Sequence, residues 1–189
     1  MTAPRCRPRR GPAAGPVAPR DPGAPGGLGR QFVSQLLERG ASKVYATARD
    51  TTTVTTPGVE LLALDLLDPS SIERAAAAAT DVTLLVNNAG VSTQQNLVRG
   101  NLAEVRREMD TNFFGTLAVT RAFADVLAGN GGGAIVNVLS ALSWFSWKGA
   151  TSYSAARQPS GASPRGPGSN SPTRAPRSSA STSEPRTPT

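Results

Sequence analysis

The stretch of residues 84–90 constrains the fold of this chain more strongly than any other feature of its sequence. It reads Leu-Leu-Val-Asn-Asn-Ala-Gly, an apolar run that ends abruptly in two amides, an alanine and a glycine. A short apolar run of this kind is typical of a parallel strand that is buried on both faces. Open α/β folds bind their ligands at the carboxyl ends of such strands. The sequence therefore predicts a buried strand over residues 82–86 and a ligand site directly after it.

Patterns typical of strands and helices alternate along the middle of the chain. Expected strands span residues 43–48, 59–64, 82–86 and 134–139, and expected helices span residues 28–39, 70–79 and about 101–128. Gly40 is a natural stop for the first of these helices, and Asp68 is a candidate N-cap for the second. Because strands that alternate with helices are joined by right-handed crossovers, the pattern predicts an α/β fold with a doubly wound parallel sheet.

The sheet predicted in this way is incomplete at both ends. Residues 1–22 show neither a strand period nor a helix period, and the pattern disappears again beyond Arg157. Of the 16 prolines, 14 lie in residues 1–25 and 158–189, and these two segments also carry the whole net charge of +7. We therefore expect a folded domain over residues 23–157, without the first and last strands of its sheet. Disordered tails rich in proline and arginine are expected over residues 1–22 and 158–189.

The composition argues against several classes of function. The single cysteine, Cys6, and the absence of histidine leave no disulfide framework and no cysteine or histidine metal site, so no metal is expected. No run approaches the roughly 18 apolar residues of a membrane span, and we expect a cytoplasmic protein with no membrane partner. The arginine-rich tails lack the interleaved aromatic residues of a single-strand binder, so no nucleic acid is expected as a partner. Nucleic-acid binding by the tails remains an alternative, which predicts an affinity that falls steeply with salt.

A glycine-rich turn precedes the first expected helix. Gly23, Gly27 and Gly29 give the spacing Gly-x-x-x-Gly-x-Gly, with Leu28 between the last two. Such a turn lets backbone N–H groups approach a pyrophosphate, and the helix N-terminus adds partial positive charge. A dinucleotide site also needs a strand that enters the turn, and residues 18–22 do not resemble one. The turn alone is weak support for a cofactor site, because a linker rich in glycine and proline readily has the same spacing.

Arg49 follows the strand expected over residues 43–48. In a dinucleotide site the residue near this strand end faces the adenosine ribose, where a carboxylate binds the diol and a guanidinium suits a 2′-phosphate. Arg49 therefore favours NADP(H), although the adjacent Asp50 leaves NAD(H) possible. The alternative is that Arg49 is an ordinary solvated residue of a loop.

Taken together, the glycine-rich turn, the stretch 87–90, Asn112, Ser140 and Tyr153 resemble the short-chain dehydrogenase/reductase family. Asn-Asn-Ala-Gly after a strand is specific, and Ser140 lies 13 residues before the Tyr-Ser-Ala-Ala that begins at Tyr153. The resemblance covers roughly residues 23–157. It implies a Rossmann-type fold, an NAD(P)(H) cofactor, and reversible hydride transfer between a small-molecule carbonyl and its alcohol. Members of the family are homo-oligomers, which is doubtful for this chain because the partner of its long interface helix is missing.

The resemblance also assigns roles to single residues. It implies that Tyr153 is the general acid/base, that Ser140 donates a hydrogen bond to the substrate oxygen, and that Asn112 holds a water that relays protons. The expected cofactor contacts are Asn88, Ala89 and Gly90 after the inner strand, and Asp65, which would contact the adenine. Each residue has an ordinary alternative: Ser140 as a strand-end cap, Asn112 as a surface amide, and Tyr153 as a half-buried phenol.

One family residue is different in this chain. The family has a lysine four residues after the tyrosine, where its ammonium favours ionisation of the phenol and holds the nicotinamide ribose. Here that position is Arg157, which we count among the catalytic residues, and Gln158-Pro159 follows it. A guanidinium is planar and almost impossible to deprotonate, so the exchange is not conservative. We therefore expect an enzyme of impaired activity, and the alternative is a truncated, non-catalytic fragment that at most binds nucleotide or a partner subunit.

The change of composition after Ala156 is typical of a shifted reading frame. With suitable third bases, the codons of residues 157–164 can be reread as an apolar continuation of the helix. Those of residues 177–189 can be reread as a buried strand followed by a loop. We therefore hypothesise that the C-terminal segment, and by analogy the N-terminal one, is a frameshift product.

Overall fold

The computed structural model of the chain describes residues 13–17 and 27–157. Its centre is a sheet of five strands in the order β3-β2-β1-β4-β5, and every neighbouring pair is parallel. The strands are β1 Ala13–Val17, β2 Lys43–Ala48, β3 Glu60–Ala63, β4 Leu84–Asn87 and β5 Ala134–Asn137. The predicted Rossmann-type, doubly wound parallel sheet is confirmed, and β2 has the predicted bounds.

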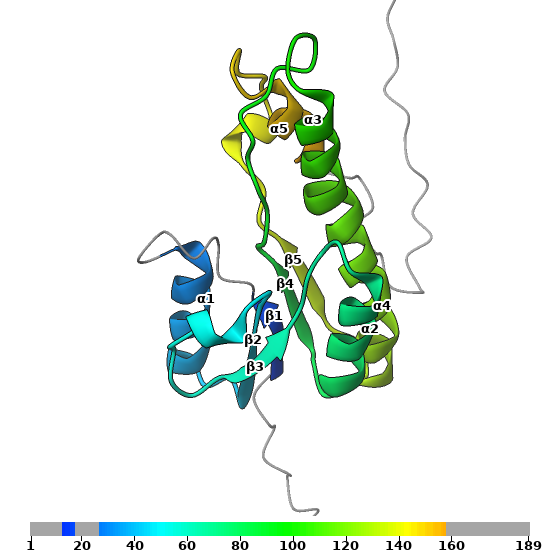
Figure 1. Cartoon of the computed structure of the whole chain (residues 1–189). Helices are drawn as coiled ribbons and strands as arrows, with labels where there is room; N and C mark the ends of the chain where they lie inside the picture. The colour runs from blue at the N-terminus through cyan, green and yellow to red at the C-terminus, as the bar shows by residue number, and fades with distance from the viewer. Residues whose placement is uncertain (1–12, 18–26, 158–189) are drawn as a thin grey trace, which may run out of the picture. The chain divides into compact units, whose positions relative to one another are not determined.

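Different helices cover the two faces of the sheet. The α-helices are α1 Leu28–Glu38, α2 Pro69–Ala78, α3 Leu102–Met109, α4 Thr116–Gly129 and α5 Thr151–Ala156. α1 lies on one face, and α2 and α4 lie on the other (Figure 1). Alternate residues of β2 enter separate cores, because side chains of a strand point to opposite faces. One core contains Val33, Val44, Ala46 and Val86, and the other contains Tyr45, Ile72, Leu85 and Phe123 among others.

The expectation that the first strand is missing was wrong. Residues Ala13–Val17 form β1, which lies between β2 and β4 in the middle of the sheet. The small residues, glycine and proline of Ala-Ala-Gly-Pro-Val give almost no strand signal. The segment forms a strand because β2 and β4, on either side of it, provide backbone hydrogen-bond partners. The pairing with β2 shifts register between Ala14 and Val17, an interval that contains Pro16, which has no backbone N–H to donate.

The helix expected over residues 101–128 is interrupted. A π-helical turn, η2 Asp110–Gly115, separates α3 from α4. Gly115 ends this turn against the loop that follows β3, where a Cβ on Gly115 would lie 2.7 Å from the Cβ of Leu66. π-turns of this kind are common at functional sites, and the apolar period of the sequence does not reveal them. The turn carries Asn112, one of the predicted site residues.

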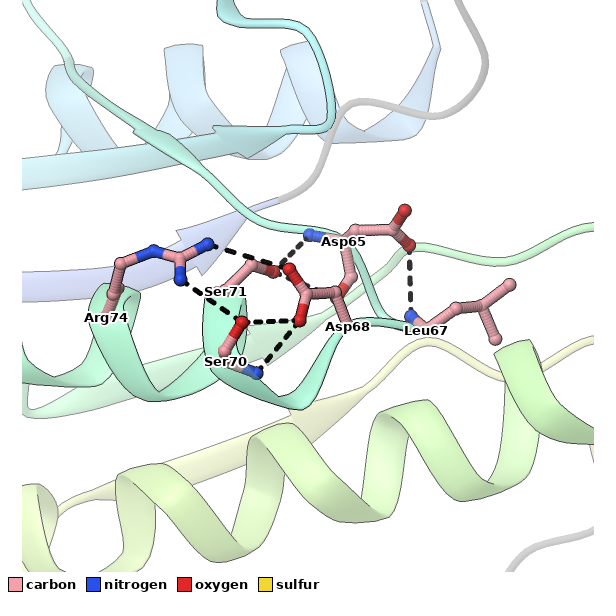
Figure 2. Close-up of polar contacts among 6 residues, drawn as sticks. All are labelled: Asp65, Leu67, Asp68, Ser70, Ser71 and Arg74. Carbon is pink, nitrogen blue, oxygen red and sulfur yellow. Dashed lines mark hydrogen bonds and ion pairs between the residues drawn. The ribbon is translucent and has the colours of Figure 1, made fainter.

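Two predicted helix boundaries are confirmed. Gly40 has a φ of +82° directly after α1, and its N–H donates to Leu37 O at 3.0 Å. Asp68 caps α2 by accepting from the N–H of Ser70 at 3.0 Å, and its carboxylate also pairs with Arg74 at 3.5 Å (Figure 2). Both residues end or begin a helix by satisfying backbone groups that the helix itself leaves open.

Several expectations concern residues outside the described ranges. The frameshift hypothesis, any strand after residue 157 and the tails other than residues 13–17 lie there, so they stay predictions. The disordered tail expected over residues 1–22 is wrong at Ala13–Val17, which form β1. In residues 13–17 and 27–157, no helix has the length and apolar character to cross a membrane. The same residues contain no group of three or more cysteine, aspartate or glutamate side chains arranged to hold a metal ion.

Candidate active site

The amide pair at the end of β4 connects three elements of the fold. Asn87 is buried, and its Nδ2 donates to Asn137 Oδ1 of β5 at 2.8 Å and to Thr120 Oγ1 of α4 at 3.1 Å. Asn88 is also buried and directly follows the strand. The structural role of Asn87 was not predicted. The alternation of β4 could have revealed it, because Asn87 is two residues from Leu85 and shares its face.

Asn112 holds the segment that follows Gly90. Its Nδ2 donates to Val91 O at 2.8 Å, and its Oδ1 accepts from Val91 N at 2.9 Å. Asn112 is only 4% exposed, so the alternative of a surface amide is wrong. Gly90 lies so close to this clamp that a Cβ built on it would be 2.7 Å from Asn112 Oδ1 and 1.6 Å from Arg157 Nη2. Only glycine fits here, because both neighbouring side chains are held by hydrogen bonds.

Arg157 connects the carboxyl ends of two neighbouring strands. It caps the C-terminus of α5 and is buried, with 7% of its surface exposed. Its Nη2 donates to Ala89 O, just beyond β4, at 2.9 Å, and its Nη1 donates to Val138 O, just beyond β5, at 3.2 Å. Hydrogen bonds from an ionised donor are stronger than neutral ones. The guanidinium therefore fixes α5 to the sheet edge that the sequence predicts as the ligand site.

Tyr153 and Ser140 lie on neighbouring elements at this edge. Tyr153 is half-buried in α5, and the Arg157 Cζ lies 5.8 Å from the centroid of its ring. Ser140 precedes the short turn η3 Ala141–Ser143, which contacts α5, and its Oγ accepts from Leu142 N at 3.2 Å. Ser140 is thus the N-cap of η3 and not the strand-end cap given as its alternative, because β5 ends at Asn137. Because the hydroxyl accepts in this bond, its own proton is not consumed by the cap.

The glycine-rich turn is described only in part. Gly23 lies outside the described residues, and Gly27 is the N-cap residue of α1, with no side-chain cap. Leu28 begins the helix and is 52% exposed, whereas Gly29 is buried in its first turn. A helix N-terminus opened by glycine leaves backbone N–H groups accessible, which is the arrangement that binds phosphate groups.

Arg49 and Asp50 directly follow β2. Arg49 is exposed. Asp50 folds back onto the turn η1 Thr51–Thr53, where its carboxylate accepts from the Thr52 hydroxyl at 2.6 Å and from the Thr52 N–H at 2.9 Å. These hydrogen bonds, the side-chain one first, hold the pKa of the Asp50 carboxyl below its usual range. The carboxylate is therefore bound within its own turn.

Asp65 is fixed at the start of the loop after β3. Its Oδ1 accepts from Leu67 N at 3.0 Å, and Ser71 Oγ bonds both its backbone N–H and its carbonyl, at 2.8 and 3.1 Å (Figure 2). The second carboxylate oxygen, Oδ2, points away from these contacts in Figure 2. These hydrogen bonds hold the loop at the residue predicted to contact an adenine.

The whole of this region matches one protein family. A family model described as short chain dehydrogenase matches residues 22–159. The chain belongs to the short-chain dehydrogenase family.

Individual relatives of the chain agree with the family match. It is 38% identical over 123 residues to a D-erythrulose reductase of Gallus gallus, covering 62% of this chain and 50% of that protein. It is 31% identical over 146 residues to the oxidoreductase calM of Penicillium decumbens, covering 69% of this chain and 48% of that one. A crystal structure of a short chain dehydrogenase from Burkholderia cenocepacia in complex with NADP superposes with a TM-score of 0.70 at 38% identity. That superposition covers 78% of this chain and 61% of the other. The chain spans about half the length of these two curated relatives.

The chain also has a buried carboxyl group that was not predicted from its sequence. Glu108, near the end of α3, is 0% exposed and accepts hydrogen bonds from Thr93 N and from Ser152 Oγ. Ser152 is buried as well and directly precedes Tyr153. The apolar period of α3 offers a signal, because Glu108 is three residues from the buried Val105 and shares its face. A glutamate at a buried helix position is rare unless it is paired, so this position could have been singled out from the sequence.

Proposed function

We propose that this chain is an NADP(H)-preferring oxidoreductase that interconverts a small-molecule carbonyl and its alcohol, with Ser140 and Tyr153 as its acid/base site. One observation carries the proposal. A buried guanidinium, from Arg157, lies beside the Tyr153 ring and bonds the carbonyl of Ala89 in the turn that follows β4. The phenol, a positive charge and this amide-rich turn are thereby joined at one edge of the sheet.

The chemistry follows from what these side chains can exchange. When bound, the nicotinamide supplies the hydride that is added to the carbonyl carbon. Tyr153 gives its phenolic proton to the carbonyl oxygen, and the hydroxyl of Ser140 donates a hydrogen bond to that oxygen as negative charge develops on it. In the reverse direction Tyr153 accepts the proton of the alcohol. Asn112 fixes the turn against which the nicotinamide would lie, and a water held nearby would return protons to the phenol.

Three features support NADP(H) as the cofactor. Gly27 and Gly29 leave the α1 N-terminus open to a pyrophosphate, and the exposed Arg49 suits a 2′-phosphate. Asp50, the residue that argued for NAD(H), is bound within its own turn. A relative at 32% identity is a carbonyl reductase [NADPH] 2 of Sus scrofa. Asp65 and the turn Asn88 to Gly90 would complete the cofactor contacts.

Impaired turnover is part of the proposal. Arg157 uses both of its Nη atoms on backbone carbonyls, so it does not replace the mobile ammonium of the family lysine. The competing function is a non-catalytic fragment that binds nucleotide only.

Assembly with a second copy also belongs to the proposal: Phe114 and Leu117 are exposed and line a groove of about 520 Å³ between α2 and α4. A cytoplasmic location and a domain over residues 23–157, extended by β1, complete it.

Binding and turnover measured on the same protein test the proposed function. The purified chain should bind NADPH by calorimetry and reduce an activated carbonyl, and Tyr153→Phe should keep the binding and lose about 100-fold or more of the turnover. Tyr45→Phe is the matched control, because the chain has two tyrosines and Tyr45 lies at the opposite, amino-terminal end of the sheet. NADPH binding without turnover would favour the fragment, and the absence of both would refute the proposal.

A further inference from the structure

Glu108 is the most deeply buried ionisable side chain of the described residues, and the proposed chemistry does not use it. It is 0% exposed, whereas the other buried charged residue, Arg157, is 7% exposed. A polar group in such a place costs free energy unless it is hydrogen-bonded. Both carboxylate oxygens are bonded: Oε1 accepts from the backbone N–H of Thr93, and Oε2 accepts from the hydroxyl of Ser152. The two partners belong to different parts of the chain.

The first partner belongs to the segment that leaves the cofactor edge. Thr93 lies three residues after Gly90, and the segment continues along the start of α5. Gln95 O accepts from Ser152 N at 3.3 Å and lies 2.9 Å from Ser152 Oγ, whose single proton is shared between Gln95 O and the Glu108 carboxylate. Leu97 N donates to Thr151 Oγ1 at 2.8 Å. These contacts form a polar seam between residues 93–97 and residues 151–152, with the Glu108 carboxyl beneath it.

The second partner belongs to the helix that carries the phenol. α5 has six residues, which is far too short for a helix to be stable by itself. It therefore depends on its neighbours, and α3 lies beside it, as Figure 1 shows. Glu108 is the α3 side chain that bonds to α5, and it does so at Ser152, next to Tyr153. A shift of Ser152 would move the phenol with it.

We infer that Glu108 is a positioning residue: its buried carboxyl joins the segment after Gly90 to α5 and so holds Tyr153 at the cofactor edge. The inference rests on the proposed function, in which Tyr153 is the acid/base. Glu108 does not touch substrate or cofactor and acts only through Thr93 and Ser152. The geometry matters because a displacement of about 1 Å in a reacting group can cost on the order of 100-fold in rate.

Two substitutions of similar size separate positioning from simple filling of space. In Glu108→Gln, the amide oxygen can still accept from the Thr93 N–H, and the amide NH2 can donate to Ser152 Oγ. The Ser152 hydroxyl proton is then donated to Gln95 O alone. Glu108→Met fills the same volume and keeps neither bond. We expect Glu108→Met to lower kcat for carbonyl reduction about tenfold or more with KM for NADPH nearly unchanged, and Glu108→Gln to recover most of that loss.

Amide hydrogen exchange gives a readout that does not depend on turnover. Glu108→Met should speed exchange at Thr93 and across residues 151–157, whereas Glu108→Gln should not. Val119→Ala, a substitution in the core of α4, is the control, because it lowers global stability without a direct contact to this seam. A chain without NADPH binding or turnover would refute the proposed function, and exchange would still decide the role of Glu108. The inference is wrong if Glu108→Gln lowers kcat and speeds amide exchange as much as Glu108→Met does. It is also wrong if Glu108→Met speeds exchange at Thr93 and residues 151–157 no more than Val119→Ala does.

Discussion

At the scale of single residues, Arg157 makes two hydrogen bonds that join the ends of neighbouring strands. The guanidinium of Arg157 reaches Ala89 O and Val138 O through two separate nitrogens, which a single ammonium does not do with the same geometry. The residue therefore stabilises the junction of β4, β5 and α5. The same bonds hold its charge against the backbone carbonyls of Ala89 and Val138.

The substitution Arg157→Lys should raise activity and lower stability. Lysine places a compact, rotatable charge near the Tyr153 phenol, so we expect kcat for carbonyl reduction to rise about tenfold. The melting temperature should fall, because one of the two strand-end carbonyls loses a charged donor. Steady-state kinetics and calorimetry on the same preparation measure both effects. Arg121→Lys, an exposed position on α4, is the matched control, and turnover of Arg157→Lys no higher than wild type would contradict the prediction.

At the scale of elements, the loop after β3 and the first turn of α2 behave as one unit. Ser71 of α2 bonds the backbone of Asp65, while Asp68 caps the helix and accepts from Ser70 through both its N–H, at 3.0 Å, and its hydroxyl, at 2.7 Å (Figure 2). The Ser70 side chain is the largest cause that holds the pKa of the Asp68 carboxyl below its usual range, and Arg74 adds to it. The cap thus keeps the predicted adenine contact in place.

The contribution of this cap should depend on pH. Because the folded-state pKa of Asp68 is lowered, the ionised cap stabilises the fold above the unfolded pKa of aspartate, and the stabilisation is lost as pH falls through the folded pKa. Asp68→Ala should therefore lower the melting temperature at pH 7 by a few degrees, and the difference from wild type should shrink towards about pH 3. Asp68→Asn keeps a capping oxygen and should lose much less at pH 7. An Asp68→Ala penalty that is equal at both pH values would disprove the assignment.

At the scale of the whole molecule, the described sheet has an open edge. β5 is the last strand in the sheet order, and no strand pairs with its outer side among the residues that the structure describes. Three of its four residues are exposed, and Val136 retains 40% of its surface. An exposed apolar edge strand offers unpaired N–H and C=O groups to another chain. We therefore expect this edge to promote self-association.

A charge on this edge should reduce self-association. Val136→Lys places an ammonium on the exposed strand, and natural edge strands use lysine in the same way. We expect the sedimentation profile to shift towards smaller species and light scattering on heating to decrease. Val98→Lys is the control, because Val98 is more exposed, at 88%, but lies in a loop. An equal effect of both substitutions would show that added charge, and not the edge, is responsible.

The limits of sequence reasoning are visible in particular residues. The bounds of β2 and the stop at Gly40 were predictable, because alternation and a positive φ are local properties. β1 was missed because its neighbours, and not its own side chains, make it a strand. The interruption of the helix at Asn112 was missed because the apolar period runs through it. Glu108 was missed because its partner Ser152 is 44 residues away.

The sequence by itself determined the family, the alternation of strands and helices, and the residue types available for chemistry. Those features depend on short spacings and on periods of two or about 3.6 residues, which can be recognised from the order of the residues alone. Only the tertiary structure decided that Arg157 bonds to Ala89, 68 residues away, and that a buried carboxyl lies beneath the helix of Tyr153. The physical reason is that such contacts are set by how helices pack on the finished sheet. Packing brings together groups whose separation along the chain carries no signal.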